Sequence, residues 1–270
     1  MNRRRFGWIA IVLILCAAVL LYRHGRSLWH PVYRRLRGRR TVADVVARYG
    51  PRAEAALKKA FTAAGVTYPP RRIALLVFKK EKRLELWAGA DGRWAFARSY
   101  PVTAASGHAG PKLREGDRQV PEGAYRVVAL NPNSSYHLSM KLDYPNEADR
   151  RRAREDGRTD PGGDIFIHGK AVSIGCVAVG DRAIEELFVL TAAVGRANVE
   201  VLIAPNDLRD GRPAETHPSD PPWADERREA IRRRLAAFPR PAAALPHPSP
   251  LRACRNPTNP VEYRSLSAGD

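Results

Sequence analysis

Short apolar runs separated by turn residues fill the middle of this 270-residue chain, a pattern that predicts a β-rich domain. The expected strands are Ile73–Lys79, Arg83–Ala88, Trp94–Tyr100, Gly123–Leu130, Tyr136–Leu142, Asp164–His168 and Asn198–Ala204. The spacing turns helical before the last of them, which predicts one helix over Asp181–Val194 with Asp181 as its N-cap. We therefore expect a mainly β fold with flanking helices, an α+β arrangement.

Helical patterns flank this region on both sides. Thr41 is a suitable cap for a short helix ending near Tyr49, and Pro51 is suited to the start of a second helix over Arg52–Ala64. On the other side, residues 221–238 predict a basic amphipathic helix that lies either on a membrane or on the domain, with one apolar side formed by Ile231, Leu235 and Phe238. The Pro-, Ala- and Arg-rich remainder is typical of a disordered tail.

Changes of composition divide the chain into four segments. Residues 1–28 are an N-terminal membrane anchor or signal segment, and residues 29–70 a basic collar with a helical stalk. Residues 71–209 form the β-rich domain, and residues 210–270 a Pro/Arg-rich tail that contains the amphipathic helix. Cys16 and Cys254 lie in the first and last segments, so no structural disulfide is expected within the folded domain.

The basic charge of the chain is concentrated beside its apolar N-terminal segment. Residues 6–22 are almost continuously apolar, which is long enough for a short membrane span, and both an anchor and a cleaved signal peptide remain open. Residues 1–40 contain 10 Arg and no acidic residue, which is more than half of the net charge of +18. This distribution favours contact with anionic lipid rather than a nucleic-acid groove, and no nucleic-acid-binding motif accompanies it.

One histidine and one cysteine carry the most specific chemistry in the sequence. His168 ends a short apolar run, and Cys176 follows Gly175 eight residues later. An imidazole beside a thiol raises the thiolate fraction that nucleophilic catalysis needs, and backbone N–H groups at Gly175 and Cys176 are suited to an oxyanion. The alternatives are an inert buried cysteine and a zinc site formed with His137. Because the chain has no C-x-x-C or H-x-x-x-H pair, we expect neither a metal nor a cofactor.

The surrounding residues resemble a known family. H-G followed by S-x-G-C, at residues 168–169 and 173–176, is similar to the signature of the L,D-transpeptidase (YkuD-type) catalytic domain, whose members are cysteine enzymes that remodel bacterial peptidoglycan. The segments G-P-K-L-R-E-G-D-R-Q-V-P-E-G at residues 110–123, N-P-N-S-S-Y-H-L-S at 131–139 and Y-P-N at 144–146 resemble the YafK-like branch in particular. The resemblance spans about residues 72–209.

The resemblance implies a role for each matching residue. Cys176 would be the nucleophile, His168 the base, Gly169 the source of the carbonyl that orients this base, and Ser173 the hydroxyl residue before the Gly-Cys pair. The implied fold is the β-sheet fold of this catalytic domain with one helix after the nucleophile. The chain departs from many members by having Ile174 and Ala178 where those members carry a second His and an Arg or Asn, and by a shorter loop before the cysteine.

The resemblance further implies a substrate and a place in the cell. The partners would be peptidoglycan stem peptides and a wall-attached lipoprotein, met on the periplasmic side of the envelope by a protein anchored in the inner membrane or secreted. Transfer of the acyl group to an amine, hydrolysis, and a catalytically silent scaffold all remain open. Candidate substrate-binding residues are basic or polar side chains near the motifs, namely His137, Lys112, Arg114, Tyr144 and Asn146.

Overall fold

The computed structural model describes residues 38–90 and 92–241. The predicted membrane segment at residues 6–22 and the end of the predicted tail lie outside these residues. Within them, the helices are too short or too polar to cross a bilayer.

One nine-stranded sheet forms the centre of the described part of the chain, which confirms the predicted mainly β architecture. The strands are β1 (Ile73–Phe78), β2 (Arg83–Ala90), β3 (Arg93–Pro101), β4 (Ala104–Ala105), β5 (Gly123–Asn131), β6 (Ser139–Leu142), β7 (Phe166–His168), β8 (Val177–Ala178) and β9 (Val199–Ala204). Their order is β3-β2-β1-β9-β5-β6-β7-β8-β4. The β1–β9 and β7–β8 pairs are parallel, and the other pairs are antiparallel.

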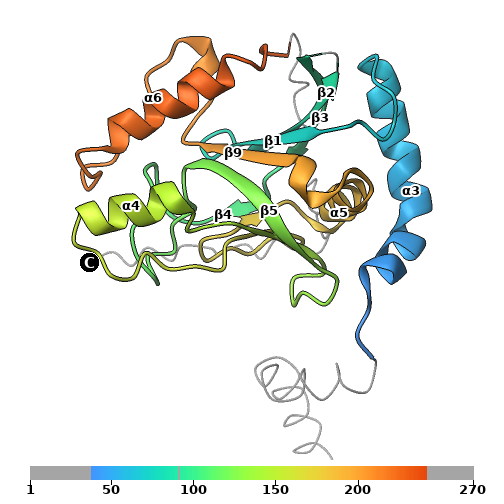
Figure 1. Cartoon of the computed structure of the whole chain (residues 1–270), viewed down its shortest axis with the longest axis horizontal. Helices are drawn as coiled ribbons and strands as arrows, with labels where there is room; N and C mark the ends of the chain where they lie inside the picture. The colour runs from blue at the N-terminus through green and yellow to red at the C-terminus, as the bar shows by residue number, and fades with distance from the viewer. Residues whose placement is uncertain (1–37, 91, 242–270) are drawn as a thin grey trace, which may run out of the picture.

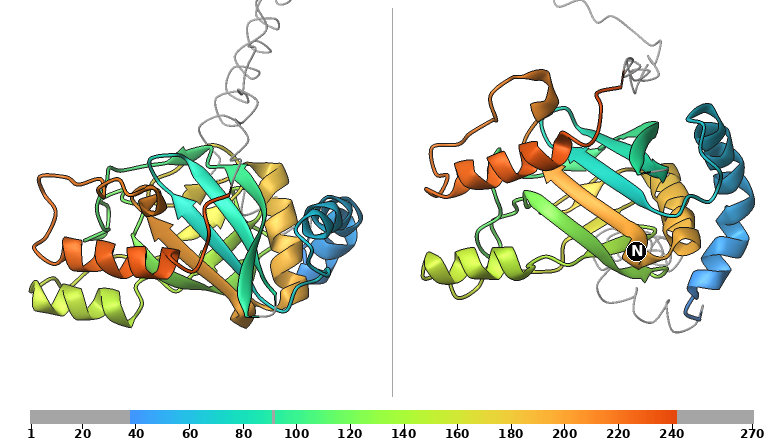
Figure 2. Two further views of the ribbon diagram at one scale, coloured as in Figure 1. Left: turned by 90° about the horizontal axis from the view of Figure 1, so that it is seen from above. Right: turned by 45° about the horizontal axis from the view of Figure 1, so that its top comes forward.

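Strand β1 shows why the sheet is covered on both faces. All six of its residues are buried, as a continuous apolar run predicts. Ile73, Leu75 and Val77 belong to one apolar core, and the alternating residues of the strand belong to a second. Helix α5 (Asp181–Val194), with α3 (Val42–Ala63) outside it, covers the first face, and α6 (Ala224–Leu235) covers the second (Figures 1 and 2).

The two short helices expected before the strands are in fact one. Helix α3 is continuous from Val42 to Ala63 and contains Pro51, so the prediction of a break at this proline was wrong. The buried residues Val45, Ala53, Leu57 and Phe61 lie at multiples of four along the helix, and this face continues past the proline. Packing of the whole face therefore outweighs the backbone hydrogen bond that proline removes. Thr41 caps the helix as predicted, in a reciprocal capping box with Asp44.

Two predicted strands begin later than expected because left-handed residues interrupt them. His137 has φ 77° and Asp164 has φ 54°, which no strand accommodates, so β6 starts at Ser139 and β7 at Phe166. Asp181 is also not the N-cap that was predicted. It is the first residue of α5, Gly180 occupies the cap position, and the Asp181 carboxylate binds Lys170 instead.

Five elements were not anticipated, namely one helix, two short strands and two 3-10 turns. The charged stretch after Asn146 forms helix α4 (Glu147–Glu155). The two-residue strands β4 and β8 pair with each other. The remaining elements are short 3-10 turns, η1 (Arg196–Asn198) and η2 (Leu208–Asp210).

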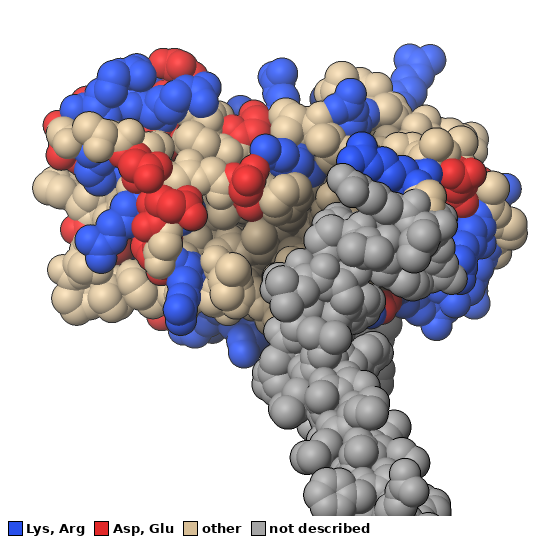
Figure 3. All heavy atoms as spheres, turned by 90° about the horizontal axis from the view of Figure 1, so that it is seen from below, with Lys and Arg blue, Asp and Glu red and all other residues tan. Residues whose placement is uncertain are grey.

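Helix α6 lies on the domain, which was one of its two predicted positions. Ile231, Leu235 and Phe238 are each at most 3% exposed and pack in the core formed with Trp87 and the second face of β1. On the part of the molecule that Figure 3 leaves uncovered by grey atoms, basic and acidic side chains are interspersed.

Candidate functional site

Strands β7 and β8 bring His168 and Cys176 to the same part of the sheet. The parallel register sets His168 beside Ala178, and Cys176 stands two residues before Ala178. Cys176 lies just before β8, and its thiol hydrogen-bonds the carbonyl of Asp164, two residues before β7. The histidine and the cysteine therefore both belong to the parallel β7–β8 pair.

The His168 ring is buried and held in one tautomer. Its Nδ1 lies 2.6 Å from the carbonyl oxygen of Gly169, and the residue is 2% exposed. A carbonyl only accepts, so Nδ1 carries the proton and donates it, which leaves the Nε2 lone pair free. Burial lowers the pKa of His168 below its ordinary value, and the bond to Gly169 acts in the opposite direction. The imidazole is thus neutral at neutral pH, with Nε2 as its basic atom.

Gly169 is a glycine because two oxygen atoms approach its backbone closely. A Cβ at this position would lie 2.7 Å from Asp181 Oδ1 and 2.7 Å from the Tyr136 carbonyl oxygen. Both are closer than real Cβ contacts, so any larger residue would displace the turn after His168.

The Cys176 thiol is partly exposed and unpaired. Its Sγ donates to the carbonyl oxygen of Asp164 at 3.8 Å, and within the described residues no hydrogen bond joins it to His168. Burial raises the pKa of the thiol, whereas the Phe166 backbone and the Lys112 charge lower it. Burial therefore favours the uncharged form of both the thiol and the imidazole.

The turn from Ser173 to Cys176 is closed by its own hydrogen bonds. Ser173 Oγ donates to the Cys176 carbonyl at 2.7 Å and accepts a longer bond of 3.3 Å from the Gly175 N–H. Gly175 has φ 122°, a conformation that side chains strongly disfavour. The small hydroxyl and the glycine thus shape the backbone that presents the thiol.

The segment from Ser106 to Gly123 lies against this turn. Ser106 bonds Ser173 through both its N–H and its hydroxyl, and the Gln119 carbonyl faces Gly175. At the other side, Lys79 Nζ donates to the Gly110 carbonyl at 2.9 Å and to the Val120 carbonyl at 3.1 Å. The segment is therefore fastened to both the thiol turn and the end of β1.

The two basic candidates in this segment differ in availability. Lys112 is 6% exposed, and its ammonium binds the Asp117 carboxylate at 2.6 Å and the Arg114 carbonyl at 2.8 Å. Its charge acts on Cys176 from within the fold, as the pKa of the thiol shows. The Arg114 residue is exposed. Of the two, only Arg114 has a side chain open to solvent.

Tyr144 and Asn146 are used within the fold. The Tyr144 hydroxyl donates to the Pro161 carbonyl at 2.8 Å, and the residue is 4% exposed. Asn146 caps α4 by accepting from Ala148 and Asp149, and its amide donates to the Ala124 carbonyl at 3.0 Å. The polar groups of both side chains are therefore hydrogen-bonded within the protein and do not need a ligand as partner.

His137 faces the helices rather than the thiol. Its Nε2 lies 2.7 Å from Glu185 Oε1 on α5, and its ring packs edge-on against Tyr49 of α3. The described part of the chain contains no cluster of three or more His, Cys, Asp or Glu side chains with metal-binding geometry.

Sequence reasoning missed two contributors to the site. The Tyr136 ring lies against His168, with 4.6 Å between ring centroids. Asp164 supplies the carbonyl that accepts a hydrogen bond from the thiol. Tyr136 occurs in a motif quoted above and Asp164 begins a predicted strand, but a contact made by a ring face or by a backbone carbonyl leaves no sequence pattern.

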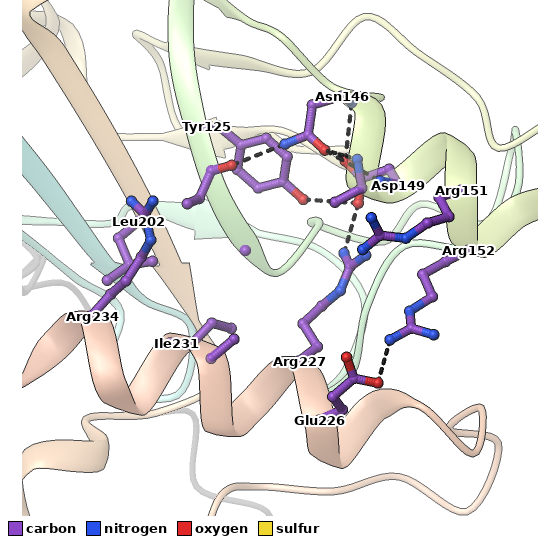
Figure 4. Close-up of a pocket in the computed structure, with 14 residues that line it drawn as sticks. Tyr125, Asn146, Asp149, Arg151, Arg152, Leu202, Glu226, Arg227, Ile231 and Arg234 are labelled. Atoms are coloured by element: carbon purple, nitrogen blue, oxygen red, sulfur yellow. Dashed lines mark hydrogen bonds and ion pairs between the residues drawn. The ribbon is translucent and has the colours of Figure 1, made fainter.

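A separate pocket lies between α4, α6 and the sheet (Figure 4). It encloses about 320 Å³, and neither Cys176 nor His168 lines it. Arg227 extends from α6 to the Asp149 carboxylate at 2.6 Å, and Arg152 binds Glu226. The charged groups drawn at this pocket are largely paired with each other, so it offers little free charge to a ligand.

Comparisons with known proteins agree with the geometry. Residues 72–201 match the family model of the L,D-transpeptidase catalytic domain, YkuD. The chain is 35% identical over 143 residues to YafK of Escherichia coli K12, provisionally named an L,D-transpeptidase, and to its counterpart in strain O157:H7. The match covers 51% of this chain and 56% of the relatives, so the chain spans just over half of their length.

Solved structures with a similar course of the chain are more distant. The helical cell shape determining protein Pgp2 from Campylobacter jejuni is 21% identical over 57% of this chain and 56% of its own, with a TM-score of 0.42. Bd1075 from Bdellovibrio bacteriovorus is 22% identical over 63% and 58% of the two chains, with a TM-score of 0.38. On the family match, residues 72–201 belong to the L,D-transpeptidase (YkuD) catalytic domain family.

Proposed function

We propose that this protein is a peptidoglycan-modifying cysteine acyltransferase that uses Cys176 as nucleophile and His168 as base. The observation that carries the proposal is the bond between His168 Nδ1 and the Gly169 carbonyl, which leaves Nε2 as the basic atom of a residue on β7, the strand paired with the one that Cys176 precedes. The family match of residues 72–201 supports peptidoglycan stem peptides as the substrate class.

The first half-reaction forms a thioester. Rotation of the thiol from the Asp164 carbonyl to His168 Nε2 allows the S–H proton to pass to the imidazole. The sulfur attacks the carbonyl carbon of a stem-peptide amide, and the Cys176 N–H stabilises the oxyanion, because the Gly175 N–H already donates to Ser173 Oγ. The C–N bond then breaks, and the imidazolium returns the proton to the departing amine.

The second half-reaction decides between transfer and hydrolysis. An incoming amine gives up a proton to His168, forms a new amide and releases the thiol, which is L,D-transpeptidation. Water in the same position gives a carboxylic acid, which is the hydrolytic alternative and includes release of a wall-attached lipoprotein. The resting pair of neutral groups serves either acceptor, because both reactions need the same base.

The proposed place of action is the periplasmic side of the cell envelope. The support is the apolar segment at residues 6–22 after three arginines, together with a substrate class that lies beyond the inner membrane. The arginines at residues 34–40 oppose this orientation under the positive-inside rule. Protease accessibility of the full-length chain in intact spheroplasts tests this: degradation of the domain places it outside the inner membrane, and protection places it inside.

A product analysis tests the function. The full-length protein and Cys176→Ala are incubated with defined peptidoglycan fragments, one set carrying a covalently attached lipoprotein peptide, and the products are identified by mass spectrometry. New amide cross-links or attached peptide identify a transferase, whereas shortened stems or freed peptide identify a hydrolase. Absence of any Cys176-dependent product contradicts the proposal and leaves a silent scaffold.

A further inference from the structure

The aromatic ring of Tyr136 covers the proposed base. The two ring centroids are 4.6 Å apart and the ring planes are inclined by 35°. Tyr136 is 39% exposed, whereas His168 is 2% exposed. Since the exposed ring of a touching pair is the outer one, Tyr136 lies between the imidazole and solvent.

The backbone of the segment that carries Tyr136 is fixed by its neighbours. Next to Tyr136, His137 adopts φ 77° and directs its Nε2 to Glu185 on α5. Glu185 also accepts from Arg52 of α3, so both helices hold the histidine in place. These contacts do not involve the tyrosine ring.

Arg40, two residues before α3, holds the other part of the same segment. The Arg40 N–H donates to Asn133 Oδ1 at 3.0 Å, and the Asn133 amide donates back to the Arg40 carbonyl at 2.8 Å. The Arg40 guanidinium reaches the His137 carbonyl at 3.3 Å. The ring of Tyr136 is thus presented from a backbone anchored on both sides, and its removal leaves these anchors intact.

We propose that Tyr136 is a positioning residue for His168, whose ring fixes the plane of the imidazole and excludes water from it. The proposal rests on the proposed role of His168 as the base. The Gly169 carbonyl fixes one edge of the ring through Nδ1, but a single hydrogen bond still permits rocking about that bond. Contact with an aromatic face removes this freedom and keeps Nε2 in one orientation, from which the thiol can reach it after rotating away from the Asp164 carbonyl.

Substitution can distinguish a role of the Tyr136 aromatic face from a role of its hydroxyl. Within the described residues the Tyr136 hydroxyl has no hydrogen-bond partner, so the ring accounts for the described contact with His168. Tyr136→Phe keeps this face, and Tyr136→Ala removes it. Val128→Ala is a matched control, because Val128 is 41% exposed and lies on β5.

The test follows His168 directly in the full-length protein. Exchange of the C2 hydrogen of His168 is measured by mass spectrometry of its peptide as a function of pH, which gives both the accessibility and the pKa of this ring. Turnover of the peptidoglycan fragments described above is measured on the same variants, with kcat and KM determined separately, and melting temperatures verify that each variant is folded.

We expect Tyr136→Ala to speed the exchange at His168 several-fold and to raise its pKa toward the ordinary value, because burial lowers it in the wild type. The kcat should fall about tenfold or more with little change in KM. Tyr136→Phe and Val128→Ala should behave like the wild type.

Two results would overturn the inference: unchanged exchange at His168 in Tyr136→Ala, or equal loss of kcat in Tyr136→Phe and Tyr136→Ala, which would assign the effect to the hydroxyl. Absence of Cys176-dependent turnover in the wild type would instead refute the proposed function. The hydrogen exchange at His168 does not depend on turnover, so it tests the role of Tyr136 in either case.

Discussion

The backbone N–H of Lys170 donates to Asp181 Oδ1 at 2.8 Å, which ties the turn after His168 to the first residue of α5. The Lys170 ammonium contacts the second carboxylate oxygen, also at 2.8 Å. Together these bonds lower the pKa of Asp181 although burial alone would raise it. Asp181 therefore serves the turn that positions the base and not the cap for which the sequence suggested it.

Two substitutions of Asp181 should distinguish the stability contributed by its bond to the Lys170 N–H from that of its ion pair with the Lys170 ammonium. Asp181→Ala leaves the Lys170 N–H without its acceptor and should lower the free energy of unfolding by about 1.5–3 kcal/mol. Asp181→Asn retains an oxygen acceptor and loses mainly the solvent-exposed ion pair, so it should cost about 1 kcal/mol or less. Denaturant unfolding of the full-length variants measures both, and equal losses would contradict the importance of the backbone bond.

The pH dependence of Cys176 alkylation should identify the protonation state of the resting site. Because burial raises the pKa of the thiol, its thiolate forms only at a higher pH than in free cysteine. Alkylation of Cys176 by iodoacetamide, followed on its own peptide, should therefore be slower at neutral pH than that of N-acetylcysteine and should rise in the alkaline range. A fast rate that is constant through neutral pH would mean a preformed thiolate and imidazolium.

Much of the fold follows from apolar spacing, whereas contacts made across the fold do not. The six apolar residues of β1 and the helical face of α5 are strong local signals, and both elements lie where they were expected. His137 looked like a strand residue, but its bond to Glu185 and its packing on Tyr49 come from distant parts of the chain and impose a left-handed backbone.

The same distinction applies to the site. The short motif around His168 and Cys176 predicts the residues and their order along the chain. It does not predict that the thiol bonds the Asp164 carbonyl or that Tyr136 covers the imidazole, because backbone carbonyls and ring faces are available at almost any residue. Helix α4 was missed because its charged sequence has too few apolar residues to reveal a period.

Arg209 should be essential for the stability of the domain. Its guanidinium binds Glu85 at 3.0 Å and Asp207 at 2.8 Å, and both carboxylates are 1% exposed. Arg209→Ala would leave two buried carboxylates with Arg83 as their remaining basic partner, so it should cost about 3–5 kcal/mol.

An ion pair exposed on both sides provides the control for Arg209. Arg154 binds Glu147 at 3.2 Å, and the two side chains are 64% and 75% exposed. Arg154→Ala should therefore change the stability by about 1 kcal/mol or less. Chemical denaturation of both variants decides the matter, and comparable losses would show that burial adds nothing to the network of Arg209.

The docking of α6 should depend on its apolar side. Leu235 is 1% exposed in the core that α6 shares with Trp87, so Leu235→Ala should destabilise the protein by about 2–5 kcal/mol. Arg233 on the same helix has a side chain that is 66% exposed, and Arg233→Ala should have an effect within about 0.5 kcal/mol. Limited proteolysis should cut after α6 residues faster in the first variant alone; similar rates in both would argue against this packing.

Lys79 determines how the site receives a molecule. By joining Gly110, Val120 and Glu122 at the end of β1, its ammonium makes the segment beside the thiol turn part of the rigid framework. We therefore expect this side of the site to keep its shape when a substrate or inhibitor binds. Compounds with few rotatable bonds are accordingly suitable probes of Cys176.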